Sequence, residues 1–317
     1  MLRLLKLAGV MSVITLTSLS SATAQELRVV ASFSIIADLA KNVGGDRIAL
    51  TTLVGPDGDA HVYEPEPADA AAMAEADVIL VNGLGFEGFV QRLAEASGTK
   101  VLAVELSKDG ELLDASEAES HAGPGAGEAA HDAEGGDHAH GVNDPHAWQS
   151  VHNAKTYVKN IEAAFCAADA AGCAVYKANA AAYLGKLEAL HEEIKAAVAS
   201  IPEEKRVIIT SHDAFFHFEH EYGIKFLAPE GVSTASEASA ADVAALIRQV
   251  REDKASAIFV ENITNQRLIE QIAAETGIAV GGTLYSDALS DESGPAATYI
   301  EMMRHNVSTI KAAIAGS

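Results

Sequence analysis

The sequence predicts an α/β protein with two lobes, each built on a parallel sheet, and a long helix between them. Short β-type runs alternate with amphipathic helices in the first half of the chain, and the same alternation returns in the second half. Such alternation is typical of parallel sheets covered on both faces. Between the halves, apolar residues keep helical spacing from Val175 to Ser200. A helix of that length is about 40 Å long and crosses from one lobe to another.

The first residues have the pattern of a secretory signal. Arg3 and Lys6 precede an apolar run from Leu7 to Leu19, and Ala22-Thr23-Ala24 follows as a small-x-small cleavage site. The run is shorter than the about 20 residues that span a bilayer. We therefore expect residues 1–24 to be a signal peptide and the mature chain to be exported.

In the first half, the runs and breaks predict strands and helices that make up a lobe over residues 25–174. Strands are expected at Glu26–Ser32, Ile48–Val54, Asp77–Asn82 and Lys100–Glu105, and helices at Ser34–Val43, at Pro67–Ala76 and from Trp148 to near Cys166. The long helix, at residues 175–201, then connects this lobe to the next. Pro202 ends it, because proline cannot continue a helix.

The second half predicts a further lobe over residues 202–317. Strands are expected at Arg206–Ser211, Lys225–Ala228, Ala257–Glu261 and Ala279–Leu284, and helices at Ala214–Tyr222, around Val243 to Val250, at Gln266–Thr276 and from Ile300 to Ile314. Each strand is followed by a helix, which again indicates a parallel sheet.

Two compositional features limit the function. The formal net charge of -23 excludes nucleic acid as a partner, because binding it needs a basic face. Cys166 and Cys173, the two cysteines of the chain, are too few for a four-cysteine zinc site. In an oxidising compartment they close a small loop if their Cα atoms lie within about 7 Å, and we favour a disulfide over free thiols.

The pattern of strands and helices is lost from Leu106 to Val142. Gly, Ala, Glu, Asp and His dominate this stretch, which buries too little apolar surface to offset its ordering entropy. We interpret residues 115–141 as a mobile loop, either a solvated insertion or a weak auxiliary metal site. The histidines that would bind metal there are His121, His131, His138 and His140.

Four residues that suit a metal ion occur outside this loop. His61, His212 and Asp287 follow predicted strands directly, and His146 lies in the stiff corner Asn143-Asp144-Pro145-His146. Ligands of open parallel sheets bind outside the carboxyl ends of the strands. Three imidazoles and one carboxylate complete a tetrahedral set for Zn²⁺.

Around these residues the chain resembles the metal-binding receptors of ABC importers for zinc and manganese. The matching motifs are Gly55-Pro56-Asp57-Gly58-Asp59-Ala60-His61 with Tyr63-Glu64-Pro65, Asn143-Asp144-Pro145-His146-Ala147-Trp148, Thr210-Ser211-His212-Asp213-Ala214-Phe215 and Leu284-Tyr285-Ser286-Asp287-Ala288-Leu289. The resemblance implies two Rossmann-like lobes joined by one long helix, with the metal held between them by His61, His146, His212 and Asp287.

The resemblance also implies the cargo, the partners and the location. Manganese receptors of this kind usually have a glutamate where His212 stands, so zinc is favoured as the transported ion. The partner is an ABC transporter permease, a periplasmic zinc metallochaperone is a further candidate, and we expect a monomer. No cysteine follows Ala24 to accept lipid, so we expect a free periplasmic protein without a lipid anchor.

Three other functions remain as alternatives. One is a manganese receptor of the same family, and another is a cell-surface adhesin that binds metal. The third is a zinc hydrolase, but a catalytic zinc keeps an open position for water, and the chain offers four ligands and no His-Glu-x-x-His motif. An esterase is disfavoured because Gly-x-Ser-x-Gly is absent. We therefore expect a binding protein and not an enzyme.

Overall fold

The computed structural model describes residues 26–115, 143–236 and 238–316. The predicted signal peptide, residues 1–24, lies outside them. So does the predicted loop, residues 115–141, except for Ala115, and with it His121, His131, His138 and His140.

The N-terminal half forms a four-stranded parallel sheet with the order β2-β1-β3-β4. Its strands are β1 (Leu27–Phe33), β2 (Ile48–Val54), β3 (Val78–Val81) and β4 (Ala103–Glu105), and its helices are α1 (Ser34–Gly44), α2 (Pro67–Glu75) and α3 (Val90–Ser97), with a 3₁₀ turn at Gly45–Arg47. All of β3 is buried, as expected of a strand covered on both faces.

The C-terminal half repeats the architecture, with the strand order β6-β5-β7-β8, again all parallel. Its strands are β5 (Val207–Ile209), β6 (Lys225–Leu227), β7 (Ala257–Glu261) and β8 (Val280–Leu284), and its helices are α7 (Phe216–Tyr222), α8 (Ala240–Asp253), α9 (Gln266–Thr276) and α10 (Tyr299–Ala315), with a 3₁₀ turn at Glu203–Lys205. The fold class predicted from the sequence is therefore confirmed.

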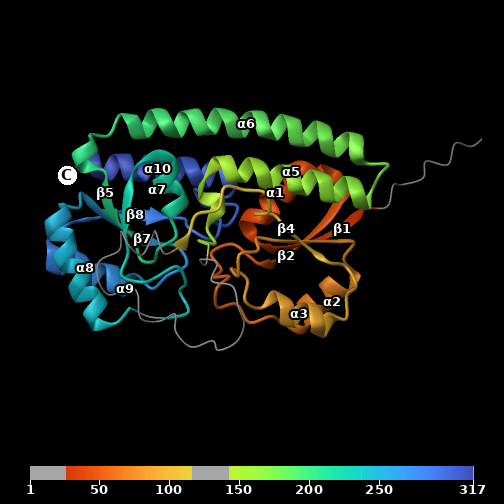
Figure 1. The fold of residues 1–317 in the computed structure, drawn as a ribbon, viewed down its shortest axis with the longest axis horizontal. Helices are drawn as coiled ribbons and strands as arrows, with labels where there is room; N and C mark the ends of the chain where they lie inside the picture. The colour runs from red at the N-terminus through yellow and green to blue at the C-terminus, as the bar shows by residue number, and fades with distance from the viewer. Residues whose placement is uncertain (1–25, 116–142, 237, 317) are drawn as a thin grey trace, which may run out of the picture.

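Two long helices connect the halves. After a 3₁₀ turn at Ala147–Gln149, α5 spans Val151–Ala168 and α6 spans Cys173–Ala199. In Figure 1, α6 runs along the upper side of both sheets, with α5 and α10 beneath it. None of the helices in the described ranges is long and apolar enough to cross a membrane. The sheets are thus held beside one another by a rigid helix of 27 residues.

A disulfide joins Cys166 at the end of α5 to Cys173 at the start of α6, with the Cα atoms 4.4 Å apart. The predicted pairing is confirmed. The bridge closes the turn between the two long helices, beside an ion pair of 2.7 Å between Arg47 and Asp169.

The buried apolar residues form two main clusters, and their division differs from the division of the chain. The larger cluster includes the N-terminal sheet, the long helices, α7 and α10, residues of the C-terminal strands such as Phe226 and Phe259, and also Tyr285 and Leu289 from beyond β8. The smaller cluster lies between the C-terminal sheet and the helices α8 and α9. The segment after β8 therefore packs into the core that the N-terminal lobe shares with the long helices.

The structure corrects two expectations of detail. Helix α3 was not predicted, because its eight residues are little more than two turns and an apolar period over so short a run is ambiguous. The stretch from Leu106 to Ala115, which lacks a sequence pattern, is held in place: Leu106 is buried, and its carbonyl accepts a hydrogen bond from Asn160. The predicted limits of the lobes, residues 25–174 and 202–317, stay a prediction.

Candidate metal centre

Four side chains from the two halves converge at the carboxyl ends of the parallel strands. They are His61, His146, His212 and Asp287, and their nearest ligand atoms all lie within 4.8 Å of one another. His146, His212 and Asp287 are fully buried, whereas the side chain of His61 is 5% exposed. The four residues selected from the sequence thus share one buried cluster.

His61 reaches the cluster from the turn that follows β2. Its backbone N–H donates to Oδ1 of Asp59 at 2.9 Å, and the other oxygen of Asp59 accepts from the hydroxyl of Thr234 in the opposite half. The imidazole packs edge to face against Phe86, with ring centroids 4.6 Å apart. His61 is therefore oriented by its backbone hydrogen bond and by the ring of Phe86.

His146 is held by the carboxylate of Asp144. Oδ1 of Asp144 accepts the backbone N–H of His146 at 2.8 Å and lies 3.2 Å from its Nδ1. Because Nδ1 donates to this oxygen, the free lone pair of Nε2 faces the cluster. Burial lowers the pKa of His146, but the charges of Asp287 and Asp144 outweigh it and raise the pKa above its ordinary value.

His212 has an equivalent partner in Glu261, the last residue of β7. Oε1 of Glu261 accepts the backbone N–H groups of Ser211 and His212 at 2.7 and 2.9 Å. Oε2 lies 2.8 Å from Nδ1 of His212, as a close ionic contact rather than an aligned hydrogen bond. Burial lowers the pKa of His212, but Glu261 and Asp287 raise it well above its ordinary value.

Asp287 supplies the carboxylate at the centre of the cluster. Its Oδ2 lies 3.1 Å from Nε2 of His212 and 3.3 Å from Nε2 of His61. Its Oδ1 is buried without a hydrogen-bond partner, 3.8 Å from Nε2 of His146. Burial raises the pKa of Asp287, but the imidazoles of His212 and His146 outweigh it and lower the pKa far below its ordinary value.

This arrangement fits a divalent cation. A buried carboxylate is costly unless it is paired, and every ion pair of Asp287 among the described residues is to an imidazole. Neutral imidazoles offer lone pairs and no compensating charge. A metal ion supplies that charge and accepts the lone pairs of all four side chains.

Sequence reasoning missed the residues that orient the ligands. Asp144 and Glu261 were not assigned a role. His217 lies beside Asp144. Its ring is buried, and its Nε2 lies 3.4 Å from the carbonyl oxygen of Asp144. An acidic residue at the end of a wholly apolar strand, as in Ala257–Glu261, was the signal for Glu261.

Next to His212 in sequence, Asp213 is a partly buried acid. Burial and the charge of Asp144 raise the pKa of its carboxyl group to about 7, against the opposing effect of His146 and His212. Asp213 is therefore only partly ionised near neutral pH.

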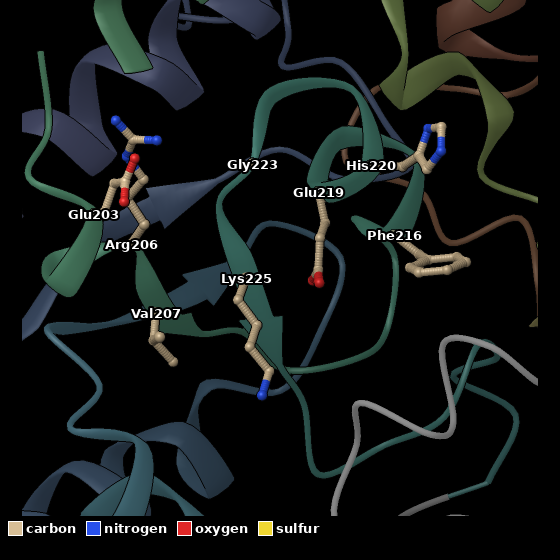
Figure 2. Close-up of a pocket in the computed structure, with 8 residues that line it drawn as sticks. All are labelled: Glu203, Arg206, Val207, Phe216, Glu219, His220, Gly223 and Lys225. Atoms are coloured by element: carbon tan, nitrogen blue, oxygen red, sulfur yellow. The ribbon is translucent and has the colours of Figure 1, made fainter. Parts of the chain in front are cut away.

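An open cavity of about 530 Å³ lies elsewhere in the C-terminal half. Figure 2 shows Glu219 pointing into it, with Lys225 and Phe216 on its sides. None of the four converging side chains lines this cavity. The candidate metal centre is thus separate from this cavity.

The chain matches known proteins along most of its length. Residues 29–313 match the family model described as the periplasmic zinc-uptake complex component A. A manganese-binding lipoprotein, MntA of Halalkalibacterium halodurans, is 34% identical over 92% of this chain and 89% of its own. The iron-binding protein YfeA of Yersinia pestis is 32% identical over 92% of this chain and 87% of its own.

Solved structures agree with these matches. The periplasmic zinc-binding protein TroA of Treponema pallidum has a TM-score of 0.78 and 30% identity to this chain. The similarity covers 91% of this chain and 99% of TroA. The relatives thus share one fold, and their names report three different metals.

The comparisons correct the expected location. We predicted a free periplasmic protein without a lipid anchor, but several relatives that match over the whole fold are named lipoproteins. The prediction is wrong on this evidence. It depended on one short segment, residues 1–25, which lies outside the described residues.

Proposed function

This chain belongs to the zinc-uptake component A family of periplasmic metal-binding receptors of ABC importers, and from that premise we propose that its cargo is Zn²⁺. The family consists of substrate-binding proteins that work with a membrane permease, so the chain is not an enzyme. In the proposed function, His61, His146, His212 and Asp287 bind the ion and release it to the permease.

The observation that carries this proposal is Oδ1 of Asp287, a buried oxygen that lies among three imidazoles and has no hydrogen-bond partner among the described residues. It supports a cation in the cluster, and the composition of the cluster supports zinc. Three nitrogen donors and one oxygen suit a borderline-soft ion with tetrahedral geometry, whereas Mn²⁺ prefers oxygen-rich surroundings. Four protein ligands also leave no open position for a reactive water molecule.

Manganese is the second candidate, because the MntA relative that covers 92% of this chain is named manganese-binding. Direct competition distinguishes the two ions. We expect metal-free protein, given equal concentrations of Zn²⁺ and Mn²⁺, to retain zinc after gel filtration, with elemental analysis as the measurement. Equal or greater retention of manganese would refute the proposed cargo.

A further inference from the structure

The segment that carries Asp287 leaves the C-terminal sheet but is fastened to the N-terminal half. Directly before Asp287, the carbonyl oxygen of Ser286 accepts two side-chain hydrogen bonds. They come from Nε1 of Trp148 at 2.9 Å and Nε2 of Gln149 at 2.7 Å. Both donors lie within the turn that follows His146.

The other end of the segment is fastened in the same way. The backbone N–H of Leu289 donates to Oγ of Ser34, the first residue of α1, at 2.9 Å. The carbonyl oxygen of Leu289 accepts from the N–H of Asp57, in the turn that leads to His61, also at 2.9 Å. The Leu289 side chain is buried in the larger apolar cluster. Asp287 is thus bracketed by contacts to the elements that hold His61 and His146.

The segment also has contacts with the C-terminal half. Nδ2 of Asn262, just after β7, donates to the carbonyl oxygen of Ala288 at 3.3 Å and to Oδ1 of Asp57 at 2.9 Å. The backbone of Tyr285 exchanges two hydrogen bonds with the side chain of Asn306 in α10, at 2.9 and 2.7 Å.

Helix α10 itself begins on the N-terminal half, because the N–H of Tyr299 donates to Oδ2 of Asp38 in α1 at 3.0 Å. The hydrogen bonds of Ser286 and Leu289, the residues that bracket Asp287, thus go to the N-terminal half.

His212 is held differently. Its backbone and ring are fixed by Glu261 of the neighbouring strand β7, within the C-terminal sheet. One face of that sheet packs on the smaller apolar cluster with α8 and α9, and residues of its strands such as Phe226 and Phe259 belong to the larger cluster. The ring of His212 contacts Asp287 at 3.1 Å and lies edge to face against the rings of His61 and His146, with centroids 5.8 and 5.4 Å apart. No hydrogen bond among the described residues ties its backbone to the elements that hold His61 and His146.

We propose that the four ligands divide three to one, although the chain supplies two from each half. His61, His146 and Asp287 form a half-site fixed to the N-terminal lobe, and His212 completes it when the C-terminal sheet moves toward them. The ion is captured by the half-site and is then retained by His212. This inference rests on the proposed binding of a divalent ion but does not depend on which ion is the natural cargo.

Pairs of spin labels measure the division directly. Glu95 on α3, Glu292 beyond Asp287 and Glu270 on α9 are exposed, and none is a ligand. Glu95→Cys is combined with Glu292→Cys in one variant and with Glu270→Cys in another, with the native disulfide kept oxidised. On saturation with Zn²⁺, we expect the 95–270 distance to shorten, whereas the 95–292 distance stays within the width of its metal-free distribution.

Equal changes in both distances, a change in the 95–292 distance alone, or no change in either would overturn the division. Elemental analysis of the same labelled samples separates this result from a failure of the proposed function, because bound zinc must be present before the distances are compared. Cd²⁺ serves as a second diamagnetic ion.

Binding kinetics provide an independent measurement. If the half-site captures the ion first, His212→Ala leaves the association rate constant for Zn²⁺ within about threefold of the value for the unchanged protein. It raises the dissociation rate constant by about 100-fold or more, because one ligand is lost. Asp287→Asn, which weakens the half-site, lowers the association rate constant instead. Equal loss of association rate in the two variants would contradict capture by the half-site.

Discussion

The direction of each imidazole is set by a neighbouring acid or by packing. Asp144 and Glu261 each contact Nδ1 of a buried histidine and accept its backbone N–H, so the ring and the main chain are fixed by one carboxylate. Such contacts also increase the basicity of the ligand nitrogen. His61 lacks such a carboxylate at its ring and is the most exposed of the four ligands.

Replacing His212 tests the assignment of the ligands. Zinc at about 100 times its Kd stabilises the native state by about 2.7 kcal/mol, by mass action. We expect His212→Ala to lose most of this gain, measured as the zinc-induced rise in Tm. His152→Ala, an exposed histidine on α5, is the matched control and should keep it. A full zinc response in His212→Ala would remove His212 from the ligand set.

Glu261→Gln tests the orienting carboxylate separately. Glutamine keeps the size and one acceptor oxygen but removes the charge that raises the pKa of His212. We expect zinc affinity to fall by about 10-fold to 100-fold, as for other partners of metal-bound histidines. Titration calorimetry with a competing chelator measures the change, and Glu270→Gln on the exposed face of α9 is the control. Unchanged affinity would show that Glu261 does not act on the ligand.

The sequence allowed the four clustered side chains to be predicted better than the residues around them. His61, His212 and Asp287 each follow a β-type run, and the carboxyl ends of parallel strands lie together whatever the strand order. Glu261 also follows such a run, but its contact with His212 depends on β7 lying next to β5, which periodicity does not specify. The fastening of Ser286 to Trp148 likewise depends on tertiary packing.

At the scale of elements, the long helices explain why the two sheets keep their relation. Helix α6 packs against α1, α5, α7 and α10, so one rigid element contacts both halves. Its buried residues Tyr176, Tyr183, Leu187 and Leu190 follow helical spacing, and this is why the sequence predicted it well. The short helix α3 was missed because eight residues are little more than two turns, too short a run for periodicity to identify a helix.

The disulfide between α5 and α6 should stabilise the fold without affecting the metal centre. Closing a loop across a sequence separation of 7 constrains the unfolded chain by about 2.5 kcal/mol. We expect the double variant Cys166→Ser, Cys173→Ser to lose about that much free energy of unfolding in urea denaturation. Its zinc affinity should stay within a factor of about two, since the bridge lies at the far end of α5. A large loss of zinc affinity would contradict this separation.

At the scale of the whole molecule, one buried carboxylate and two buried histidines link metal binding to pH. The pKa values of His146 and His212 are raised, so the metal-free cluster binds protons more tightly than the unfolded chain does. This contributes stability to the metal-free protein below the ordinary histidine pKa of about 6.5, and the contribution is lost as pH rises through the raised values. The lowered pKa of Asp287 has the opposite effect on stability. Its contribution is present above the ordinary Asp pKa of about 3.9 and is lost only as the pH falls from there toward the lowered value.

Zinc reverses the first of these effects, because it binds the imidazoles in their neutral form. As the pH falls from 8 to 5.5, protons compete at His146 and His212, and with both protonated the apparent Kd should rise about 100-fold per pH unit. As the pH falls, the Tm of the metal-loaded protein therefore decreases while the Tm of the metal-free protein increases. The two values converge. Thermal melts with and without zinc, together with chelator competition at each pH, measure the two curves. A zinc affinity that stays flat over this range would contradict coordination by three histidines.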